Sequence, residues 1–433
     1  MGITFSFKQS ISIVLSDISK NPSSLFITKQ SNYKAIQKMT SFGIVVRMIL
    51  MKKIVLIFLS LTLSFPSQAK HQYEEYSFYA FAKYEIKGSN NYYKFNSDLI
   101  QDKDVIKEIK NKKKTRLVSY LLFEDNKIKI DEHDLPQIIK GNKGLLPSHS
   151  MGKSLVSYVT GYAICEGYID NINVKLDDWS TVKGTLYEGQ KLIDLLNMRA
   201  GDQKIIGERN FNSDNGIQDK SGKRSVNVNV YPIKFIMESK ILQNTKKSKP
   251  VYNYNALATN TIMNYTIFKV GDDYQKLLNK VFKEDAKIKN SVFFSKTIRS
   301  FYSDEEGEFG RYSFYADRYD YLRIAKSIMD HWNNDTCVGK YLKTIYEQRI
   351  NKNKKSYNGD RSGQFDVAMY TKKYGGQFHF NIVGLSKRKI LGMSGFGGQN
   401  IIIDFEKERI IVVNSRDRHY NWKKIVLKKL KQK

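Results

Sequence analysis

The sequence predicts an α/β (α+β) protein: an antiparallel sheet flanked by helices and interrupted by a helical insertion domain. Strand-like segments fall at about 115–180 and 340–433, and the stretch between them, about 181–339, carries mainly helical and loop-like patterns. Strands at both ends of a helical middle are typical of one sheet domain with an insertion. With 433 residues, 41% of them hydrophobic, the chain can bury a large core.

The first strands are predicted as a hairpin at 118–132, with its turn at Asp125-Asn126, because two apolar runs flank that polar pair. A helix is then expected from Ser150 to about Gly167. Apolar residues recur in it at a spacing of about four, which is the spacing of one helix face. These residues are Met151, Leu155, Val159 and Ala163.

The middle of the chain is predicted to be helical at Gln190–Asn197 and helical or loop-like from about 205 to 340. Polar residues at Asn210–Lys223 and Lys246–Pro250 indicate breaks within it. The last hundred residues return to strand patterns and end in a helix. The strands are expected at 375–383, 401–405 and 409–414, the last hairpin turn at 404–407, and the closing helix at 422–431.

Residues 51–69 have the features of a secretory signal peptide. Lys52-Lys53 are followed by the apolar stretch 54–63, and Ser67-Gln68-Ala69 is a small-x-small cleavage site. We interpret residues 1–50 as the product of a start codon assigned too early, with a genuine N-terminal extension as the alternative. The mature protein is therefore expected to be periplasmic or secreted, without stable membrane insertion after cleavage.

The formal net charge of +29 invites a nucleic-acid partner, but the composition argues against one. The chain holds 57 lysines and 15 arginines, whereas arginine is the residue that favours bidentate contacts to phosphate and guanine. No nucleic-acid-binding motif occurs, so we interpret the charge as compositional bias and expect no nucleic-acid partner.

The chain has two cysteines, Cys165 and Cys337. Cys165 lies in an apolar run and is expected to be a small buried hydrophobic residue. Export would also permit a bridge between the two cysteines, and the sequence leaves that open. No cluster of cysteine and histidine has the spacing of metal ligands, so no metal site and no cofactor are expected.

Ser150 and Lys153 form a Ser-x-x-Lys pattern at the start of the predicted helix. This spacing puts hydroxyl and ammonium on one face, a turn apart, which suits a nucleophile whose proton is taken by a neighbouring base. The pattern alone is weak in a lysine-rich chain. It also occurs at Ser31, Ser67, Ser180 and Ser386.

Five segments occur in an order that strengthens this interpretation. They are the hairpin 118–132, the Ser-x-x-Lys element in 147–154, Leu195-Leu196-Asn197-Met198-Arg199-Ala200-Gly201, the tyrosine-containing segment Val251-Tyr252-Asn253-Tyr254-Asn255-Ala256, and Gly395-Phe396-Gly397-Gly398-Gln399. Together they resemble the serine β-lactamase and penicillin-binding protein superfamily. The similarity is greatest to its class C-related branch of esterases, D-aminopeptidases and 6-aminohexanoate-oligomer hydrolases. It covers about 115–425 and implies one hydrolase domain over 70–433.

The resemblance implies roles for particular residues. Ser150 would be the nucleophile, with Lys153 and Tyr254 sharing the proton transfers; which of the two is the base stays open. Backbone N–H groups of Ser150 and of the Gly398–Gln399 stretch would hold the oxyanion, and donors of this kind contribute roughly 3 kcal/mol each. Gly397 would leave room for the substrate along the strand edge.

Structural alternatives exist for each assignment. Ser150 could serve only as a helix N-cap. Tyr252 could be the catalytic tyrosine, with Tyr254 packed behind it. The glycines at 395–398 could form an ordinary turn. Asn255 could help to orient substrate or could be a surface-loop residue.

Two departures from the family pattern bear on the substrate. Phe396 occupies a position where many relatives have lysine or histidine, and Ala256 replaces the usual serine or asparagine near the tyrosine. A phenyl ring offers a β-lactam carboxylate neither charge nor hydrogen bond, so the sequence favours an uncharged ester, linear amide or peptide-like substrate. The alternatives are a penicillin-interacting enzyme (a β-lactamase or D-alanyl carboxypeptidase) and a non-catalytic binding module. A third is a basic protein that binds nucleic acid or anionic envelope polymers. The substrate and the oligomeric state are not defined by the sequence.

Overall fold

The computed structural model describes most of the chain from Ala82 onward. The described residues are 82–111, 117–135, 144–203, 217–218, 224–226, 232–296, 310–353, 367–416 and 419–432. The predicted signal peptide at 51–69 and residues 1–50 lie outside this part, as does the predicted break at 210–223 apart from 217–218, which belong to a short strand.

The main sheet has nine strands in the order β10-β11-β12-β13-β14-β15-β3-β4-β2. All neighbours pair antiparallel except β2 and β4, which are parallel. The strands are β2 (Asn96–Ser97), β3 (Leu117–Glu124), β4 (Lys127–His133), β10 (Ile350–Asn351), β11 (Thr371–Gly375), β12 (Phe378–Ile382), β13 (Ile390–Gly395), β14 (Gln399–Asp404) and β15 (Arg409–Ser415).

A second sheet of four strands has the order β1-β8-β9-β5, and β6 pairs with β7 elsewhere. These strands are β1 (Ala82–Ile86), β5 (Leu146–Pro147), β6 (Ile217–Gln218), β7 (Arg224–Val226), β8 (Val292–Lys296) and β9 (Gly310–Ala316). The helices are α4 (Lys103–Lys110), α6 (Met151–Cys165), η2 (Leu176–Asp178), η3 (Ser180–Val182), α7 (Leu192–Leu196), α8 (Ile233–Met237), α9 (Lys240–Asn244), α10 (Ala256–Val270), η4 (Gly271–Asp273), α11 (Tyr274–Leu278), η5 (Asn279–Asp285), α12 (Arg318–Asn333), α13 (Cys337–Glu347), α14 (Val367–Tyr370), η9 (Lys423–Leu427) and α15 (Lys428–Lys431).

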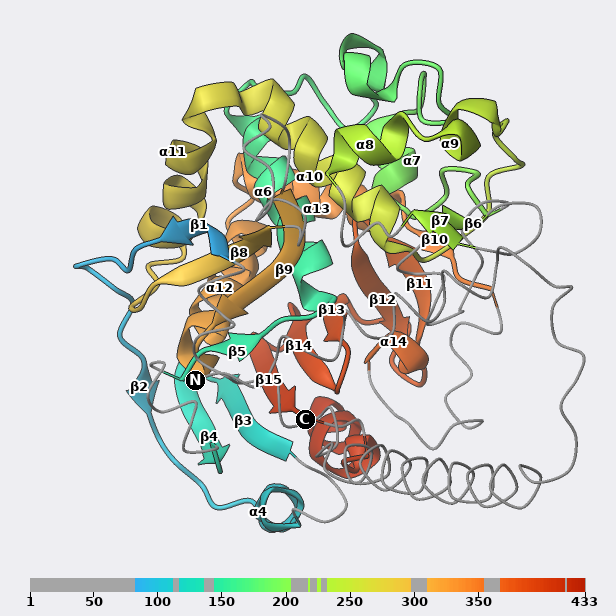
Figure 1. Ribbon diagram of the computed structural model, residues 1–433. Coiled ribbons are helices and arrows are strands. Elements are labelled where there is room, and N and C mark those ends of the chain that lie inside the picture. The colour runs from blue at the N-terminus through green and yellow to red at the C-terminus, as the bar shows by residue number, and fades with distance from the viewer. Residues whose placement is uncertain are drawn as a thin grey trace, which may run out of the picture. The chain divides into compact units, whose positions relative to one another are not determined.

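Both faces of the main sheet are covered (Figure 1). Successive side chains of a strand point to opposite faces, and β3 shows this clearly. Leu121 and Phe123 belong to the core beneath α6 and α12, whereas Tyr120 and Leu122 belong to the core formed with α4, η9 and α15. Burial on both faces explains why this strand is an almost unbroken apolar run.

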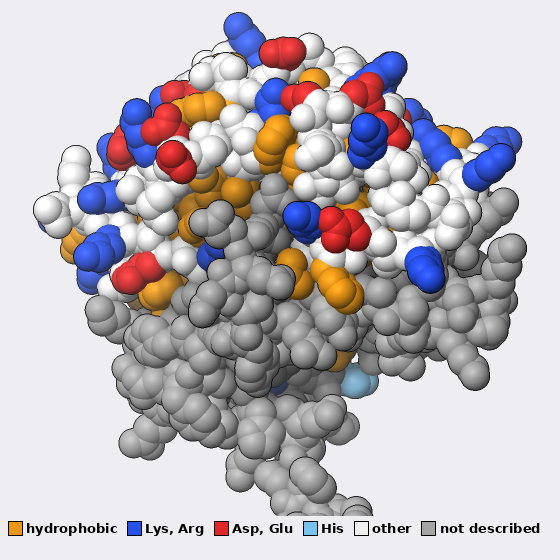
Figure 2. All heavy atoms as spheres, turned by 45° about the horizontal axis from the view of Figure 1, so that its top comes forward, with side chains coloured by type: hydrophobic (Ala, Val, Ile, Leu, Met, Phe, Trp, Pro, Cys, Tyr) orange, Lys and Arg blue, Asp and Glu red, His pale blue; other side chains and the backbone are white. Residues whose placement is uncertain are grey.

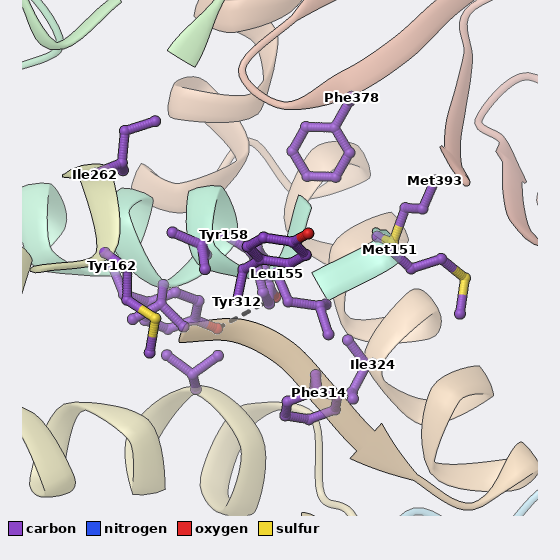
Figure 3. Close-up of a cluster of buried hydrophobic side chains, with 14 of the residues drawn as sticks. Met151, Leu155, Tyr158, Tyr162, Ile262, Tyr312, Phe314, Ile324, Phe378 and Met393 are labelled. Carbon is purple, nitrogen blue, oxygen red and sulfur yellow. Dashed lines mark hydrogen bonds between the residues drawn. The ribbon is translucent and has the colours of Figure 1, made fainter. Parts of the chain in front are cut away.

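Helix α6 is the central helix of the larger core. Every residue from Met151 to Ala163 is buried, and Figure 3 shows Leu155 and Tyr158 among side chains from neighbouring strands and helices. A helix that is buried all round is fixed by packing on every side. Its first turn is therefore held rigidly against the sheet.

Several sequence-based expectations are confirmed. The antiparallel sheet with flanking helices is present. The 118–132 hairpin is β3–β4, and its turn residues Asp125 and Asn126 have φ of 50° and 57°, the left-handed conformation that two-residue hairpin turns require. The predicted helix 150–167 is α6, the strands at 401–405 and 409–414 are β14 and β15, and the closing helix is η9–α15.

Two expectations were wrong. The stretch from 205 to 340 is not only helical and loop-like, because β8 and β9 lie within it and build the second sheet. The strand predicted at 375–383 begins at Phe378, because Gly376 and Gln377 form a turn with φ of 54° and 66°. The strands β8 and β9 pair with each other, but no short hairpin turn joins them, and their outer partners β1 and β5 are distant in sequence. The local pattern therefore gave little indication of this sheet.

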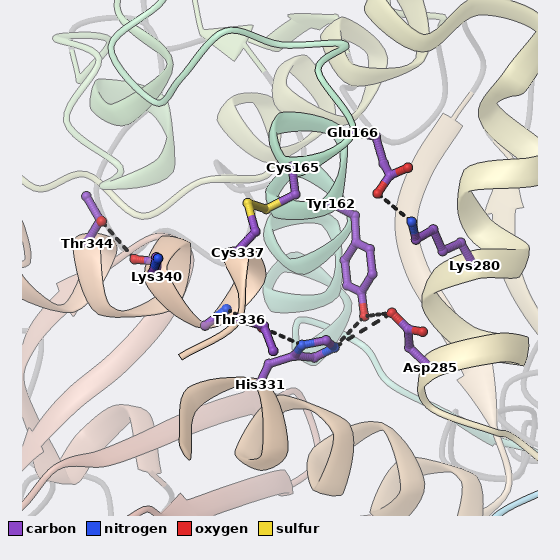
Figure 4. Close-up of a disulfide and its surroundings, with 11 residues drawn as sticks. Tyr162, Cys165, Glu166, Lys280, Asp285, His331, Thr336, Cys337, Lys340 and Thr344 are labelled. Carbon is purple, nitrogen blue, oxygen red and sulfur yellow. Dashed lines mark hydrogen bonds and ion pairs between the residues drawn. A yellow bond between two sulfur atoms is a disulfide. The ribbon is translucent and has the colours of Figure 1, made fainter. Parts of the chain in front are cut away.

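The cysteine expectation also needs correction. Cys165 is half-buried and forms a disulfide with Cys337, across 172 residues of sequence (Figure 4). Cys337 opens α13 and is exposed. The bridge fastens the C-terminal end of α6 to α13. Sequence alone could not reveal this proximity, because it depends on the packing of two distant helices.

Charged side chains of both signs lie on the surface. Figure 2 shows one face of the molecule, where acidic side chains are interspersed among the lysines and arginines. Within the described residues, no helix is both long enough and apolar enough to cross a membrane.

Candidate active site

Ser150 lies where the chain passes from β5 into α6. It occupies the N-cap position, yet its side chain makes no capping hydrogen bond, and it is half-buried. The residue before it, His149, has a φ of 48°, which is uncommon for a residue other than glycine. The sharp turn and the absence of a capping hydrogen bond favour a chemical role for Ser150 over the helix N-cap alternative.

Lys153 lies one helical turn further on and is almost completely buried, with 1% exposure. Its Nζ donates a hydrogen bond of 2.8 Å to the backbone carbonyl of Asn255. The same Nζ lies 4.5 Å from the ring centroid of Tyr254 and 4.5 Å from that of Tyr312. Burying an amine is costly unless polar partners and aromatic faces surround it, so this environment is built for the lysine.

Tyr254 is the tyrosine beside the lysine. Its ring is half-buried and meets Tyr374 edge-on at 6.0 Å. Tyr252 is more deeply buried and packs against Tyr374 in a small apolar cluster with Met198. Of the two candidates, the structure brings Tyr254 to Lys153.

The segment 251–256, which contains Tyr254, is held in place by the buried carboxylate of Asp202. Asp202, at 1% exposure, accepts hydrogen bonds from Asn253 Nδ2 at 3.0 Å and Asn255 Nδ2 at 3.1 Å. Burial raises the pKa of the Asp202 carboxyl, and the hydrogen bonds from Asn253, Tyr187 and Asn255 act in the opposite direction. Asn255 Oδ1 also caps α10 by accepting from Ala258 N at 2.8 Å. The side chain of Asn255 is thus directed inward, and the residue reaches Lys153 through its carbonyl oxygen.

The glycine-rich turn between β13 and β14 adjoins the serine segment. A Cβ on Gly395 would lie 2.2 Å from the carbonyl oxygen of Ser148, so the two backbones are in direct contact. Gly397 and Gly398 have φ of 80° and 88°, a region that glycine adopts without strain. The Gly398 N–H donates to the Gly395 carbonyl at 3.2 Å, which closes the turn.

The remaining predicted residues of this turn differ in environment. The Gln399 side chain is fully buried and donates to the Ser415 carbonyl, so a role for this residue toward substrate would belong to its backbone N–H. Phe396 is 48% exposed and meets the His149 ring edge-on at 5.8 Å. An apolar ring therefore stands at the outer edge of the turn, beside the residue that precedes Ser150.

A further contact fixes the first turn of α6 to the sheet. Ser154 Oγ donates to the Gln377 carbonyl at 2.6 Å, and the Gln377 side chain binds Thr259 of α10 and the carbonyls of Leu195 and Leu196. The Leu-Leu-x-Met segment recognised in the sequence therefore buttresses the site and holds its parts in register.

The structure brings together Ser150, Lys153, Tyr254 and the turn 395–399, which are about 250 residues apart at the extremes. A hydroxyl, a buried amine and a phenol are the groups needed to move a proton during nucleophilic attack. Sequence reasoning missed Tyr312 and Asp202. Tyr312 lies on β9, which was not predicted, and a lone aspartate carries no motif.

The chain has a β-lactamase/transpeptidase-like fold, as the sequence predicted. By structure the chain is similar to a Bacillus anthracis protein provisionally assigned as a 6-aminohexanoate-dimer hydrolase. The TM-score is 0.56 and the identity 14%, over 84% of this chain and 92% of that one.

Two further structures are more distant. The octameric penicillin-binding protein homologue from Pyrococcus abyssi has a TM-score of 0.49 at 14% identity, over 75% of each chain. The class C β-lactamase from Rhodobacter sphaeroides has a TM-score of 0.47 at 12% identity, over 74% of this chain and 94% of that one. By sequence, the chain matches no protein-family model and no curated protein.

Proposed function

We propose that the protein is a serine hydrolase that forms an acyl-enzyme on Ser150 and hydrolyses an ester or a linear amide. The observation that carries the proposal is the environment of Lys153. Its amine is buried one helical turn from Ser150, hydrogen-bonded to Asn255 and flanked by the rings of Tyr254 and Tyr312. A purely structural helix start has no need of such an arrangement.

In the proposed reaction, Ser150 Oγ attacks the substrate carbonyl carbon while its proton passes to the Lys153 amine or the Tyr254 phenolate. The tetrahedral intermediate collapses, the bond to the leaving oxygen or nitrogen breaks, and the proton moves to that leaving group. Water then attacks the acyl-enzyme by the same route, releasing the acid and restoring the serine. Either residue can serve as the base in this scheme.

The oxyanion is proposed to bind the backbone N–H groups of Ser150 and Gln399, as the resemblance implies. The proposal is supported by the contact of Gly395 with Ser148, which keeps the turn beside the serine segment. Such preorganised donors stabilise the developing charge without having to reorganise.

For the substrate we propose an uncharged acyl group. Phe396 would form an apolar wall beside the acyl group. Its 48% exposure and its contact with His149 support this assignment. A penicillin-interacting enzyme is the second candidate, because the Ser-x-x-Lys element and the tyrosine segment also resemble those of penicillin-binding proteins. The first candidate is favoured because Phe396 offers no charge or hydrogen bond to a carboxylate.

We also propose that the protein is exported after cleavage behind Ala69. The Cys165–Cys337 disulfide supports this, because disulfides persist in oxidising compartments such as the periplasm.

Intact-mass measurement tests the proposal. The chain from Lys70 onward is exposed to a fluorophosphonate and, separately, to benzylpenicillin, alongside Ser150→Ala. We expect one fluorophosphonate adduct on the wild type and none on the variant. A penicillin adduct would indicate that the substrate is a cell-wall peptide or a β-lactam. A folded protein that forms no adduct with either reagent would contradict the proposed hydrolase.

A further inference from the structure

Asp202 is a buried carboxylate that directly follows the Leu-Leu-x-Met segment 195–201. Its side chain accepts three hydrogen bonds, from Tyr187 Oη at 2.8 Å, Asn253 Nδ2 at 3.0 Å and Asn255 Nδ2 at 3.1 Å. Its exposure is 1%. A carboxylate in such a place is stable only where donors surround it, so the site is built around an acceptor.

Two of the three donors flank Tyr254 on either side. Asn253 is the residue before the tyrosine and Asn255 the residue after it. Each is fixed a second time. The Asn253 backbone N–H donates to the Met198 carbonyl at 2.7 Å, and the Asn255 side chain caps α10. The Asp202 carboxylate therefore binds both residues that flank Tyr254 and fixes the position of the tripeptide 253–255.

The same carboxylate is linked to the lysine through Asn255. The side-chain amide of Asn255 donates a hydrogen bond to Asp202. Its backbone carbonyl accepts one from Lys153 Nζ at 2.8 Å. A shift of the Asn255 peptide plane would move the acceptor that holds the ammonium. The lysine amine and the tyrosine ring are thus located by a single turn of chain, which is itself located by Asp202.

We propose that Asp202 is a positioning residue for the acylation step: through Asn253 and Asn255 it sets the distance and orientation between Lys153, Tyr254 and Ser150. The inference rests on the proposed function, since it assigns Asp202 a task only if Ser150 is acylated. Asp202 does not contact the reacting atoms. Its effect is on geometry, and misplacement by about 1 Å can cost about 100-fold in rate.

Asp202→Asn is the decisive substitution. It preserves size, but replaces one accepting oxygen with an amide that meets the amide of Asn253 or Asn255, donor against donor. The turn then has to shift to relieve the conflict. We expect the maximal rate at which the fluorophosphonate phosphonylates Ser150, which stands in for the acylation rate, to fall about 30- to 100-fold. The half-saturating reagent concentration should change less than threefold.

The matched control is Asp194→Asn. This carboxylate lies on α7 and pairs with Arg199 Nε at 2.8 Å, whereas the side chains of Asn253 and Asn255 bond Asp202. The chemical change is identical, so acylation should stay within twofold of wild type.

Two further variants cover the case in which Asp202→Asn fails to fold. Tyr187→Phe removes the donor that does not belong to the turn, and should lower the melting temperature while leaving acylation of the folded fraction within threefold. Asn253→Ala removes a donor that does belong to it, and should slow acylation about tenfold.

The outcomes separate the two proposals. If the wild type is acylated and Ser150→Ala is not, the hydrolase stands. Wild-type acylation rates in both folded Asp202→Asn and Asn253→Ala would then overturn the positioning role, as would equal slowing by Tyr187→Phe and Asn253→Ala, which would indicate a purely structural carboxylate. A wild type that is not acylated at all removes the proposed function and this inference with it.

Discussion

The Ser-x-x-Lys pattern occurs at Ser150–Lys153 and again at Ser180–Lys183, and the two copies lie in opposite environments. Ser150 opens a helix that is buried all round, and Lys153 has 1% exposure. Ser180 opens the short 3-10 helix η3, and both Ser180 and Lys183 are exposed.

The Ser-x-x-Lys spacing therefore brings the two side chains together but does not by itself activate them. An exposed lysine is a solvated ammonium, whereas a buried amine with a carbonyl and two aromatic rings around it can be tuned for proton transfer. If this contrast is correct, matched substitutions in the two copies should give sharply different results.

The largest expected effect is that of Ser150→Ala. It should abolish turnover and acylation, because removal of a nucleophile costs on the order of 10⁶-fold in kcat in the best-studied serine hydrolase. The melting temperature should stay nearly unchanged, since the Ser150 side chain caps nothing. Ser180→Ala is the control and should behave as wild type. Normal acylation of Ser150→Ala would erase the contrast between the copies.

Lys153→Ala should reduce the acylation rate by about 10²- to 10⁴-fold, the range for loss of a general base. Some stability should be lost as well, because Asn255 loses its hydrogen-bonding partner. Lys183→Ala is expected to leave both quantities within experimental error. Rates are measured by time-resolved intact mass, and melting by circular dichroism. Equal rates for the two lysine variants would mean that burial of Lys153 has no chemical purpose.

The disulfide tests whether the C-terminal end of α6 affects the reactivity of Ser150 at its N-terminal end. Removing it with Cys165→Ala and Cys337→Ala should lower the free energy of unfolding by about 2–5 kcal/mol, because a loop of 172 residues is released in the unfolded chain. Acylation should remain on Ser150, since Ser154 and Gln377 hold the first turn independently. Urea unfolding and adduct mapping measure the two effects. A folded variant that has lost Ser150 acylation would show that the site depends on the bridge.

A smaller expected effect is the pH dependence of stability that comes from the buried His379. Burial, and then the nearby Lys352, hold the pKa of His379 well below its ordinary value of 6.5. The unfolded chain therefore binds a proton near pH 6.5 that the folded chain refuses. Stability is complete above that pH and falls as pH decreases, by up to about 1.4 kcal/mol per pH unit.

His379→Gln should flatten part of this slope between pH 6.5 and 5, as measured by urea unfolding at several pH values. The pKa of His331 is lowered by burial too, so some slope remains. The same slope in wild type and His379→Gln would contradict the assignment.

Much of this molecule could be predicted from its sequence. The β3–β4 hairpin, α6 and the β14–β15 pair carry strong local patterns, and the ordered motifs located Ser150, Lys153 and Tyr254. The second sheet was missed because no short turn joins β8 to β9, and because its outer strands β1 and β5 lie far from them in sequence. The positions of Tyr312 and Asp202 were not visible, because they contact Lys153 and the Asn253–Asn255 turn only in the folded chain.

Burial of Lys153 is expected to make Ser150 the reactive serine of this chain. The most direct test is to label the folded wild-type chain with a fluorophosphonate, digest it, and locate the adduct by tandem mass spectrometry. We expect the label on the peptide that contains Ser150 and none on the peptide that contains Ser180. An adduct on Ser180, an equal distribution between the two, or a folded protein without any adduct would contradict the claim.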